Sequence, residues 1–245
     1  MATASMEAYL RPALKTSLLL LSAVSVHLSL SPPNPPVKQE ELYWRSVRAK
    51  ATLFEKFVQS ITFCSKTMVW VGVLTEILVP TIASAWSRHW ASALFDASAS
   101  YSGCECHPLL IAGALFTILA ASLRIWCFKK LGPLFTFEIT IRPKHELITS
   151  GPYSFVRHPS YTGVFLTLIG ASLLLFAPSN WVATKGVWTV PGALFGLFWA
   201  VKCAFAFRGT YLRLTTEDEV LRETFGVEWE EYARRVPWRL LPGVF

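Results

Sequence analysis

The chain has 245 residues, of which 53% are hydrophobic and only 16% are charged, and its mean hydropathy is +0.41. This composition excludes an ordinary soluble domain and indicates a membrane protein. The formal net charge of +7 is modest, so the placement of the charges along the chain is more informative than their sum.

The first predicted element is an apolar helix within residues 16–36, a stretch that has no formally charged residue. It resembles a signal peptide because Arg11 and Lys15 precede it. No small-residue cleavage site follows, however, and we therefore expect a retained transmembrane helix. The prolines within residues 31–36 should end this helix, since proline lacks the amide donor and clashes with the preceding turn.

Four further apolar runs approach the roughly 20 residues that are needed to cross a bilayer. They lie at about residues 66–85, 108–128, 159–176 and 186–207. The sequence therefore predicts an all-α, polytopic membrane protein with about five transmembrane helices, of which the second is the least clearly defined.

Lysine and arginine residues outside these spans alternate from one side to the other. Five lie in residues 37–60, five in 129–157 and six in the tail that follows residue 207, whereas the intervening segments each carry one near the span. The positive-inside rule then places the N-terminus in the lumen and the C-terminal tail in the cytosol. Residues 145–163 fall on the same cytosolic side as the tail.

Three charged residues lie within the predicted spans or at their edges, namely Glu76, Arg124 and Lys202. Charged side chains inside a membrane are functional candidates by default. Arg124 and Lys202 can equally extend their side chains to the membrane interface. Glu76 lies further from the ends of its span, and the sequence leaves its role open.

Residues 145–163 (HELITSGPYSFVRHPSYTG) form a polar stretch at the mouth of the fourth span. Pro159 suits the first turn of a helix, and backbone amides at such a terminus can bind an anion. An alternative is that Arg157 contacts lipid headgroups while His158 caps the helix. The residues alone leave both interpretations open.

The tail carries a second polar pattern. Apolar residues in 211–225 have helical spacing, and Arg213 and Glu217 are four residues apart on the same face. From spacing alone, an ion pair at the surface is the stronger interpretation. Gly226 is well placed to end this helix, and residues 226–235 can form another turn or two.

Signatures of several other sites are missing or incomplete. The sequence contains no GxGxxG, no GxxxxGK[ST], no GxSxG and no HExxH. Its Cys104-Glu105-Cys106-His107 segment lacks the second ligand pair of a zinc site, so no metal is expected there.

The central stretch and the tail together resemble the isoprenylcysteine carboxyl methyltransferase family, within the wider group of membrane-embedded phospholipid-methyltransferase-like proteins. The resemblance covers roughly the C-terminal half. The matching residues are His145 to Tyr153, Arg157 to Tyr161 and Gly163, followed in the tail by Arg213, Glu217, Phe225, Gly226, Trp229, Tyr232 and Arg235 to Pro237.

The resemblance implies an enzyme of the protein-S-isoprenylcysteine O-methyltransferase type in the endoplasmic reticulum membrane. Such an enzyme transfers a methyl group from S-adenosylmethionine to the carboxylate of a C-terminal prenylated cysteine. Residues 1–130 would then hold three transmembrane helices. Residues 131–245 would form the catalytic region, with a cytosolic loop, two transmembrane helices and a cytosolic tail helix. The implied partners are prenylated proteins and membrane lipid, with no nucleic acid and no metal ion.

Site residues follow from the same resemblance, position by position. Arg213 would bind the substrate carboxylate, and Arg213 and Glu217 would form the catalytic pair. The implied cofactor contacts are Glu138, His145, Glu146, Leu147, Ile148, Tyr153, His158, Pro159, Ser160, Tyr161 and Glu217.

The chemistry agrees with this assignment. When a carboxylate attacks a sulfonium, an anion meets a cation and no proton has to move, so no acid–base pair is required. The protein has to align the two groups, which can lower the barrier by several kcal/mol. Arginine offers a planar fork that matches a carboxylate, and lysine cannot reproduce it.

Three alternatives remain at this point. The first is a related membrane methyltransferase that acts on another lipid or on a small hydrophobic acid. The second is a sterol-reductase-like enzyme that uses NADPH, although such proteins are generally longer than this chain. The third is a membrane scaffold without activity, which the intact Arg213/Glu217 pair disfavours.

Overall fold

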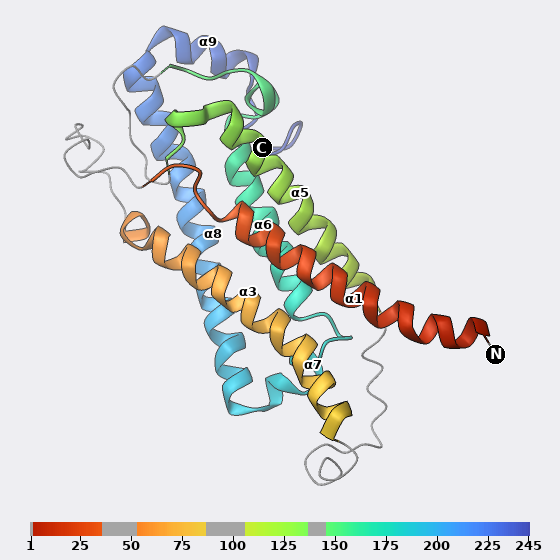
Figure 1. The fold of residues 1–245 in the computed structure, drawn as a ribbon. Coiled ribbons are helices and arrows are strands. Elements are labelled where there is room, and N and C mark those ends of the chain that lie inside the picture. Colours follow the sequence, from red (N-terminus) through yellow and green to blue (C-terminus); the bar gives the residue numbers. More distant parts are fainter. Residues whose placement is uncertain (1, 36–52, 87–105, 137–145) are drawn as a thin grey trace.

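The computed structural model describes residues 2–35, 53–86, 106–136 and 146–245 (Figure 1). These residues form helices and short 3-10 turns joined by loops, with no strand in the described ranges. The helices are α1 (Ala2–Ser29), α3 (Leu53–Trp86), α5 (Pro108–Leu131), α6 (Pro159–Leu175), α7 (Trp181–Thr184), α8 (Val190–Phe225) and α9 (Val227–Arg235). The 3-10 turns are η2 (Gly132–Leu134), η3 (Gly151–Ser154) and η4 (Gly186–Trp188).

Four segments of the described chain are long and apolar enough to cross a membrane, namely Arg11–Ser29, Phe57–Val79, Pro108–Leu134 and Val190–Phe225. The predicted all-α, polytopic membrane fold is therefore confirmed. The fourth of the five predicted spans is α6, which has 17 residues. At 1.5 Å per residue it is only about 25 Å long, somewhat less than the hydrocarbon core of a bilayer.

Helix ends agree with the sequence where a proline or glycine sets them. α1 ends at Ser29, before the prolines, and α6 begins at Pro159. Gly226 ends α8 with φ of 53°, a conformation that favours glycine, and its amide donates to the carbonyl of Arg222 at 2.9 Å.

The helix of the fifth predicted span continues past residue 207, where that apolar run ends. α8 runs without a break from Val190 to Phe225, so the tail helix continues the span. No proline interrupts the sequence there, and Gly209 stays helical because it packs against a ring. A Cβ atom at Gly209 would lie only 2.1 Å from Cδ2 of Phe54. The second span is also longer than predicted, since α3 already begins at Leu53.

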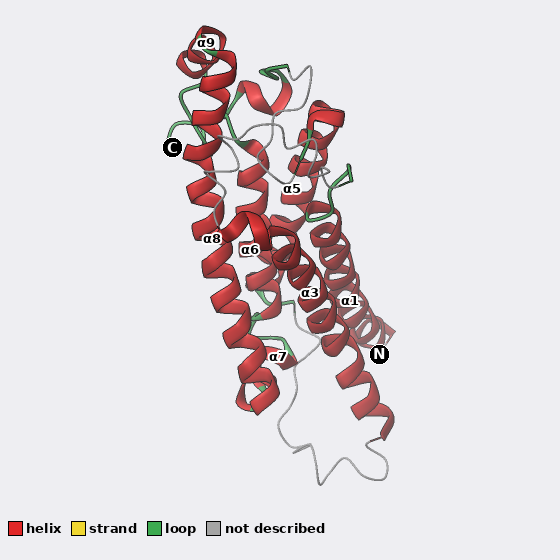
Figure 2. Ribbon diagram, turned by 90° about the vertical axis from the view of Figure 1, so that its left-hand side faces the viewer, coloured by secondary structure: helices red, strands yellow, loops and turns green. Residues whose placement is uncertain are grey.

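α5 and α6 form the closest helix pair, and Figure 2 shows them side by side with α8 along the bundle. Small residues allow this approach. A Cβ at Gly113 would lie 2.8 Å from the carbonyl oxygen of Gly170, and a Cβ at Gly163 would lie 2.5 Å from Cγ of Arg124. Such backbone contact between small residues is typical of membrane helix packing.

We expect Gly163→Ala to destabilise the protein by about 1–3 kcal/mol, because the buried Arg124 side chain has to shift. Thermal unfolding in detergent measures the effect. Gly196→Ala is the matched control, since a Cβ there meets only Phe176 at 3.7 Å, an ordinary contact. Equal thermal stability of both variants would contradict the packing argument.

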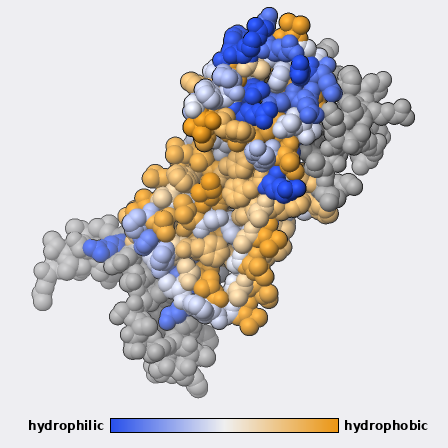
Figure 3. All heavy atoms as spheres, turned by 180° about the vertical axis from the view of Figure 1, so that it is seen from behind, coloured by the Kyte–Doolittle hydropathy of each residue, from blue (hydrophilic) through white to orange (hydrophobic). Residues whose placement is uncertain are grey.

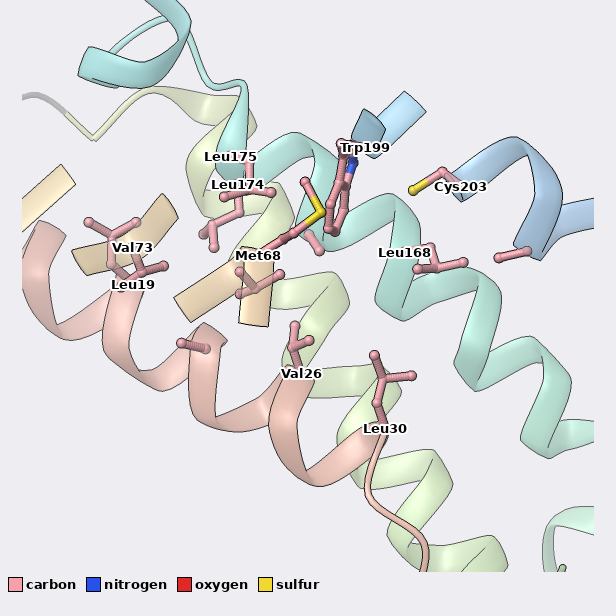
Figure 4. Packing of buried hydrophobic residues seen from close by; sticks show 14 of the residues in the cluster. Leu19, Val26, Leu30, Met68, Val73, Leu168, Leu174, Leu175, Trp199 and Cys203 are labelled. Atoms are coloured by element: carbon pink, nitrogen blue, oxygen red, sulfur yellow. The ribbon is translucent and has the colours of Figure 1, made fainter. Parts of the chain in front are cut away.

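The buried core joins the N-terminal helix to the rest of the bundle. Leu19, Val26 and Leu30 of the N-terminal segment pack with side chains of α3, α6 and α8 (Figure 4). The helix that resembles a signal peptide is thus an integral part of the fold.

The outer surface divides into a polar end and an apolar body. In Figure 3 the hydrophilic residues gather at the upper end, and hydrophobic residues cover the helical body below. Large exposed side chains on α8 contribute to this apolar surface, among them Leu194, Leu197, Phe198 and Val201. An apolar surface of this extent suits contact with lipid.

The three intramembrane charges are all buried. Glu76 pairs with Lys15 at 2.6 Å and also accepts the amide of Trp181 at 2.6 Å, so it joins α1, α3 and α7. Arg124 is 1% exposed and Lys202 is 6% exposed. Both side chains are thus enclosed by protein.

Candidate functional site

A pocket opens at the polar end of the bundle, where α3, α5, α6 and α8 meet the loop before α6. It encloses about 1380 Å³, including open solvent at its mouth. Both sequence patterns reach it, the stretch around residues 146–161 and the tail helix around residues 210–221. The fold thus brings together two segments that are separated by almost 50 residues along the chain.

Most of the site residues predicted from the sequence line this pocket. They are Glu146, Leu147, Ile148, Tyr153, His158, Ser160, Tyr161, Arg213 and Glu217. Pro159 is buried as the first residue of α6 and does not line it. Glu138 and His145 lie outside the described residues.

The pocket has two halves of different character. One half carries Glu146, Tyr153, His158 and Glu217, which present ionisable and aromatic groups. The other half is mainly apolar and is lined by Leu30, Phe54, Val58, Ile61, Thr62, Ser65, Val164, Leu168, Ala206 and Thr210. Along α8 the lining residues pass from the apolar half to the polar half at Arg213.

Arg213 is 6% exposed, so an ion pair at the surface is excluded as its role. Its guanidinium lies 5.8 Å from the ring centroid of Phe54 and 5.6 Å from that of Tyr161. Aromatic faces favour a guanidinium, and the planar fork of an arginine matches a carboxylate.

A buried carboxylate that the sequence analysis missed holds the polar half together. Asp218 is 5% exposed, and its Oδ1 lies 2.8 Å from Nε2 of His158. Its Oδ2 lies 3.2 Å from Nη1 of Arg157 and 3.1 Å from Nε of Arg239. The other ring nitrogen of His158 lies 3.7 Å from Glu217. Asp218 therefore fixes the orientation of His158 in the pocket wall.

The C-terminal strap, residues 236–245, crosses the start of α6. The amide of Arg157 donates to the carbonyl of Trp238, and the amide of His158 donates to that of Arg239, both at 2.9 Å. The hydroxyl of Thr162 donates to the carbonyl of Leu240 at 2.8 Å. The strap thus engages the two backbone amides that directly precede α6. Arg157 contacts Asp218 and the strap in place of the alternative role at lipid headgroups.

Two tyrosines, Tyr153 of η3 and Tyr232 of α9, close the polar half. The hydroxyl of Tyr232 donates to the backbone carbonyl of Tyr153 at 2.8 Å. Burial raises the pKa of both phenols, and for Tyr153 the nearby Cys127 thiol and Glu217 carboxylate raise it further. Both phenols therefore stay neutral near pH 7 and can act as hydrogen-bond donors.

Arg124 forms the back of the pocket and connects three segments. Its Nη1 donates to the carbonyl and the hydroxyl of Ser160, both at 3.0 Å, and its Nε donates to the carbonyl of Ser29. The ring of Phe128 also covers the guanidinium, with its centroid 4.9 Å from Cζ of Arg124. The role of Arg124 in positioning Ser160 was not apparent in the sequence.

Fold and site define a membrane-embedded helical protein with a pocket that joins a polar half to an apolar half. The profile of the isoprenylcysteine carboxyl methyltransferase (ICMT) family matches residues 112–195. Over this part of its length the chain is similar to the family.

Two of the three relatives described below are named as isoprenylcysteine methyltransferases, and the third is named as a metal-resistance protein. A protein-S-isoprenylcysteine O-methyltransferase B of Arabidopsis thaliana is 33% identical over 51% of this chain and 55% of its own length. The human protein-S-isoprenylcysteine O-methyltransferase is 30% identical over 53% of this chain and 40% of its own length. A cobalt-zinc-cadmium resistance protein of Cupriavidus metallidurans is 32% identical over 69% of this chain and 60% of its own length. The matched segment thus spans less than two thirds of each of these relatives.

Proposed function

We propose that the protein is an S-adenosylmethionine-dependent methyltransferase of the endoplasmic reticulum membrane that esterifies the C-terminal carboxylate of prenylated cysteine. One observation carries this proposal. Arg213 lies at the junction of a polar half and an apolar half of one pocket. If a carboxylate on a lipid chain binds here, its charge lies at this junction. The methyl donor then occupies the polar half, and the lipid chain occupies the apolar half.

The polar half suits S-adenosylmethionine, which combines a cation with an aromatic base. Glu146 and Glu217 place carboxylates at the pocket wall, where they favour a positive charge. The rings of His158 and Tyr161 are stacked with centroids 5.6 Å apart, and they can offer an aromatic face to an adenine. We assign donor binding to these residues together with Leu147, Ile148, Tyr153 and Ser160, which share the wall.

The bound cofactor supplies a methyl group on a sulfonium, so the O–CH₃ bond to the acceptor forms as the S–CH₃ bond breaks, without proton transfer. Arg213 would bind the acceptor carboxylate and hold one oxygen toward the donor. Its burial keeps the guanidinium away from competing water, which strengthens the contact. The neutral tyrosines leave the carboxylate as the nucleophile, because they present no anion of their own.

The orientation follows from the distribution of lysine and arginine and is part of the proposal. With the N-terminus in the lumen, the polar end of the bundle faces the cytosol, from which a water-soluble donor arrives. The apolar half then lies among the membrane-spanning helices, where a prenyl chain is soluble.

Incubation of membranes that contain the protein with labelled S-adenosylmethionine and S-farnesyl cysteine should yield a base-labile methyl ester. Base lability distinguishes an ester from methylation of an amine or a thiol. If the labelled donor binds but the farnesylated acceptor is not labelled, the proposed acceptor is wrong. The proposed cofactor is then still supported. Binding of NADPH in place of the donor would refute both.

A further inference from the structure

The C-terminal strap, residues 236–245, has two sides of different character. Its inner side contacts the polar half of the bundle, where Nε of Arg239 lies 3.1 Å from Oδ2 of Asp218 and Val236 is buried against α9. Its outer side carries large apolar side chains that lie at the surface. They are Trp238 (37% exposed), Leu241 (50%), Val244 (75%) and Phe245 (38%). Exposed apolar side chains gathered in so short a segment indicate a contact surface.

A stripe of exposed apolar side chains on α8 leads toward the strap. Its members are Leu194, Val201, Phe205 and Leu212. They are seven, four and seven residues apart, so they lie on one face of the helix. Because α8 is long and apolar enough to cross a membrane, this stripe is the face that it presents to lipid.

The same face of α8 becomes acidic shortly after Leu212. Glu219 and Glu223 continue the stripe at the next positions of the same register, and both are exposed. An ionised carboxylate is unfavourable in the hydrocarbon core, so lipid contact along this face ends between Leu212 and Glu219. These two residues are about 10 Å apart along the helix axis, which places the membrane interface just beyond Leu212.

The strap lies at this level of the bundle. The ring of Phe245 is stacked on that of Tyr211 with centroids 6.1 Å apart, and Tyr211 directly precedes Leu212 on α8. The strap also contacts the first turn of α6, where the hydroxyl of Thr162 donates to the carbonyl of Leu240 at 2.8 Å. α9 lies further out, because α8 extends about 20 Å beyond Leu212 before α9 begins. In Figures 1 and 2 the C-terminus accordingly lies below α9.

We propose that the strap docks on the membrane interface, with Trp238, Leu241 and Val244 among the lipid headgroups and the upper acyl chains. Tryptophan is enriched at this depth, and the irregular backbone of the strap is tolerated there because the headgroup region is hydrated. The occupant is lipid because the outer side of the strap continues the lipid-facing stripe of α8 through the contact between Phe245 and Tyr211.

Docking of the outer side holds the inner side in place. The carbonyls of Trp238 and Arg239 accept the amides of Arg157 and His158, both at 2.9 Å. Arg239 also contacts Asp218, which orients His158 in the pocket wall. The strap therefore connects a lipid contact to the polar half of the pocket. The docking is independent of the proposed function, and only the ligand of the polar half, the methyl donor, rests on it.

Photo-crosslinking in lipid nanodiscs tests the docking on the wild-type protein. The discs contain phosphatidylcholine and a small share of a phospholipid with a diazirine near the glycerol end of its acyl chain. Adducts mapped by mass spectrometry should occur in residues 236–245 and around Leu212, and not in residues 227–235 of α9. Adducts around Leu212 without any in the strap overturn the docking. A second copy that covers the strap gives this same map together with two chains per disc, and it also overturns the docking.

Leu241→Asp combined with Val244→Asp places two charges on the outer side and leaves Arg239 unchanged. The yield of strap adducts should fall at least about fivefold, because a carboxylate avoids the apolar part of the interface. Affinity for labelled S-adenosylmethionine should fall about threefold or more, because Asp218 and His158 lose support from the strap. Val227→Asp is the matched control, since Val227 is 70% exposed but begins α9, beyond the interface, and it should keep both wild-type values.

Leu241→Met combined with Val244→Leu keeps the outer side apolar and should also retain the wild-type adduct yield and donor affinity. Thermal unfolding identifies a variant that does not fold, and in that case the adduct map of the wild type decides the docking. Donor affinity that stays unchanged despite the loss of strap adducts overturns the link between lipid contact and the polar half. If the wild type forms strap adducts but binds no S-adenosylmethionine, the proposed function is wrong and the docking is supported.

Discussion

Replacement of Arg213 by lysine is expected to lower kcat/KM for the prenyl cysteine acceptor by about 10- to 100-fold, because a charged, two-pronged hydrogen bond becomes a single contact. Because lysine preserves the positive charge, the decrease in kcat/KM reports how much the two-pronged guanidinium geometry contributes. Affinity for the methyl donor should stay within about twofold, since the donor contacts lie in the polar half of the pocket. Initial rates with both substrates varied, combined with equilibrium binding of labelled donor, separate the two effects.

Arg208→Lys is the matched control for this change. Arg208 lies on the same helix but is exposed, so the same substitution there should leave both parameters unchanged. Turnover like that of the wild type in Arg213→Lys would show that the arginine serves packing only. A loss of donor affinity equal to the loss of kcat/KM would instead indicate that the polar half has collapsed.

Much of the fold could be predicted because it depends on local features. Long apolar runs define the membrane helices, and Pro159 and Gly226 mark helix ends through their own backbone preferences. The continuity of the helix past residue 207 could not be predicted from the apolar run, for a related reason. Hydropathy falls there, yet a helix continues through a change of polarity when no residue breaks it, and Gly209 is held by contact with Phe54.

The missed part of the site depends on contacts between distant segments. Asp218 follows Glu217 directly, and in the sequence it is one acidic residue among several. Its significance comes from His158, Arg157 and Arg239, which approach it from another loop and from the C-terminal strap. The buried state of Lys202 and Arg124 has the same origin, since other helices supply the partners that make burial tolerable.

The family profile and the site do not coincide along the chain. The matched region, residues 112–195, contains α5, α6 and only the first turns of α8. Arg213 and Glu217 lie beyond it and line the pocket because α8 continues past the end of the apolar run. The rigid continuation of α8 thus connects the membrane-spanning part of the chain to the polar half of the pocket.

Asp218→Asn is expected to weaken binding of the methyl donor by about tenfold or more. The substitution preserves shape but leaves two arginines and a histidine around a neutral amide. Removal of one partner from a buried ion pair typically destabilises by about 3–5 kcal/mol. Since Asp218 acts through His158 and does not line the pocket, it is a positioning residue. The effect should therefore appear mainly in KM for the donor, with a smaller change in kcat at saturating donor.

Glu230→Gln provides the comparison, because it breaks an exposed pair in which Oε1 of Glu230 lies 2.9 Å from Nη2 of Arg222. Exposed pairs contribute about 0–1 kcal/mol, so this variant should resemble the wild type. Thermal unfolding of both variants separates general destabilisation from the effect on binding. If Asp218→Asn lowers the unfolding temperature but leaves KM for the donor unchanged, the carboxylate serves the fold alone. If KM rises while the isolated protein stays folded at the assay temperature, Asp218 sets the position of His158 against the donor.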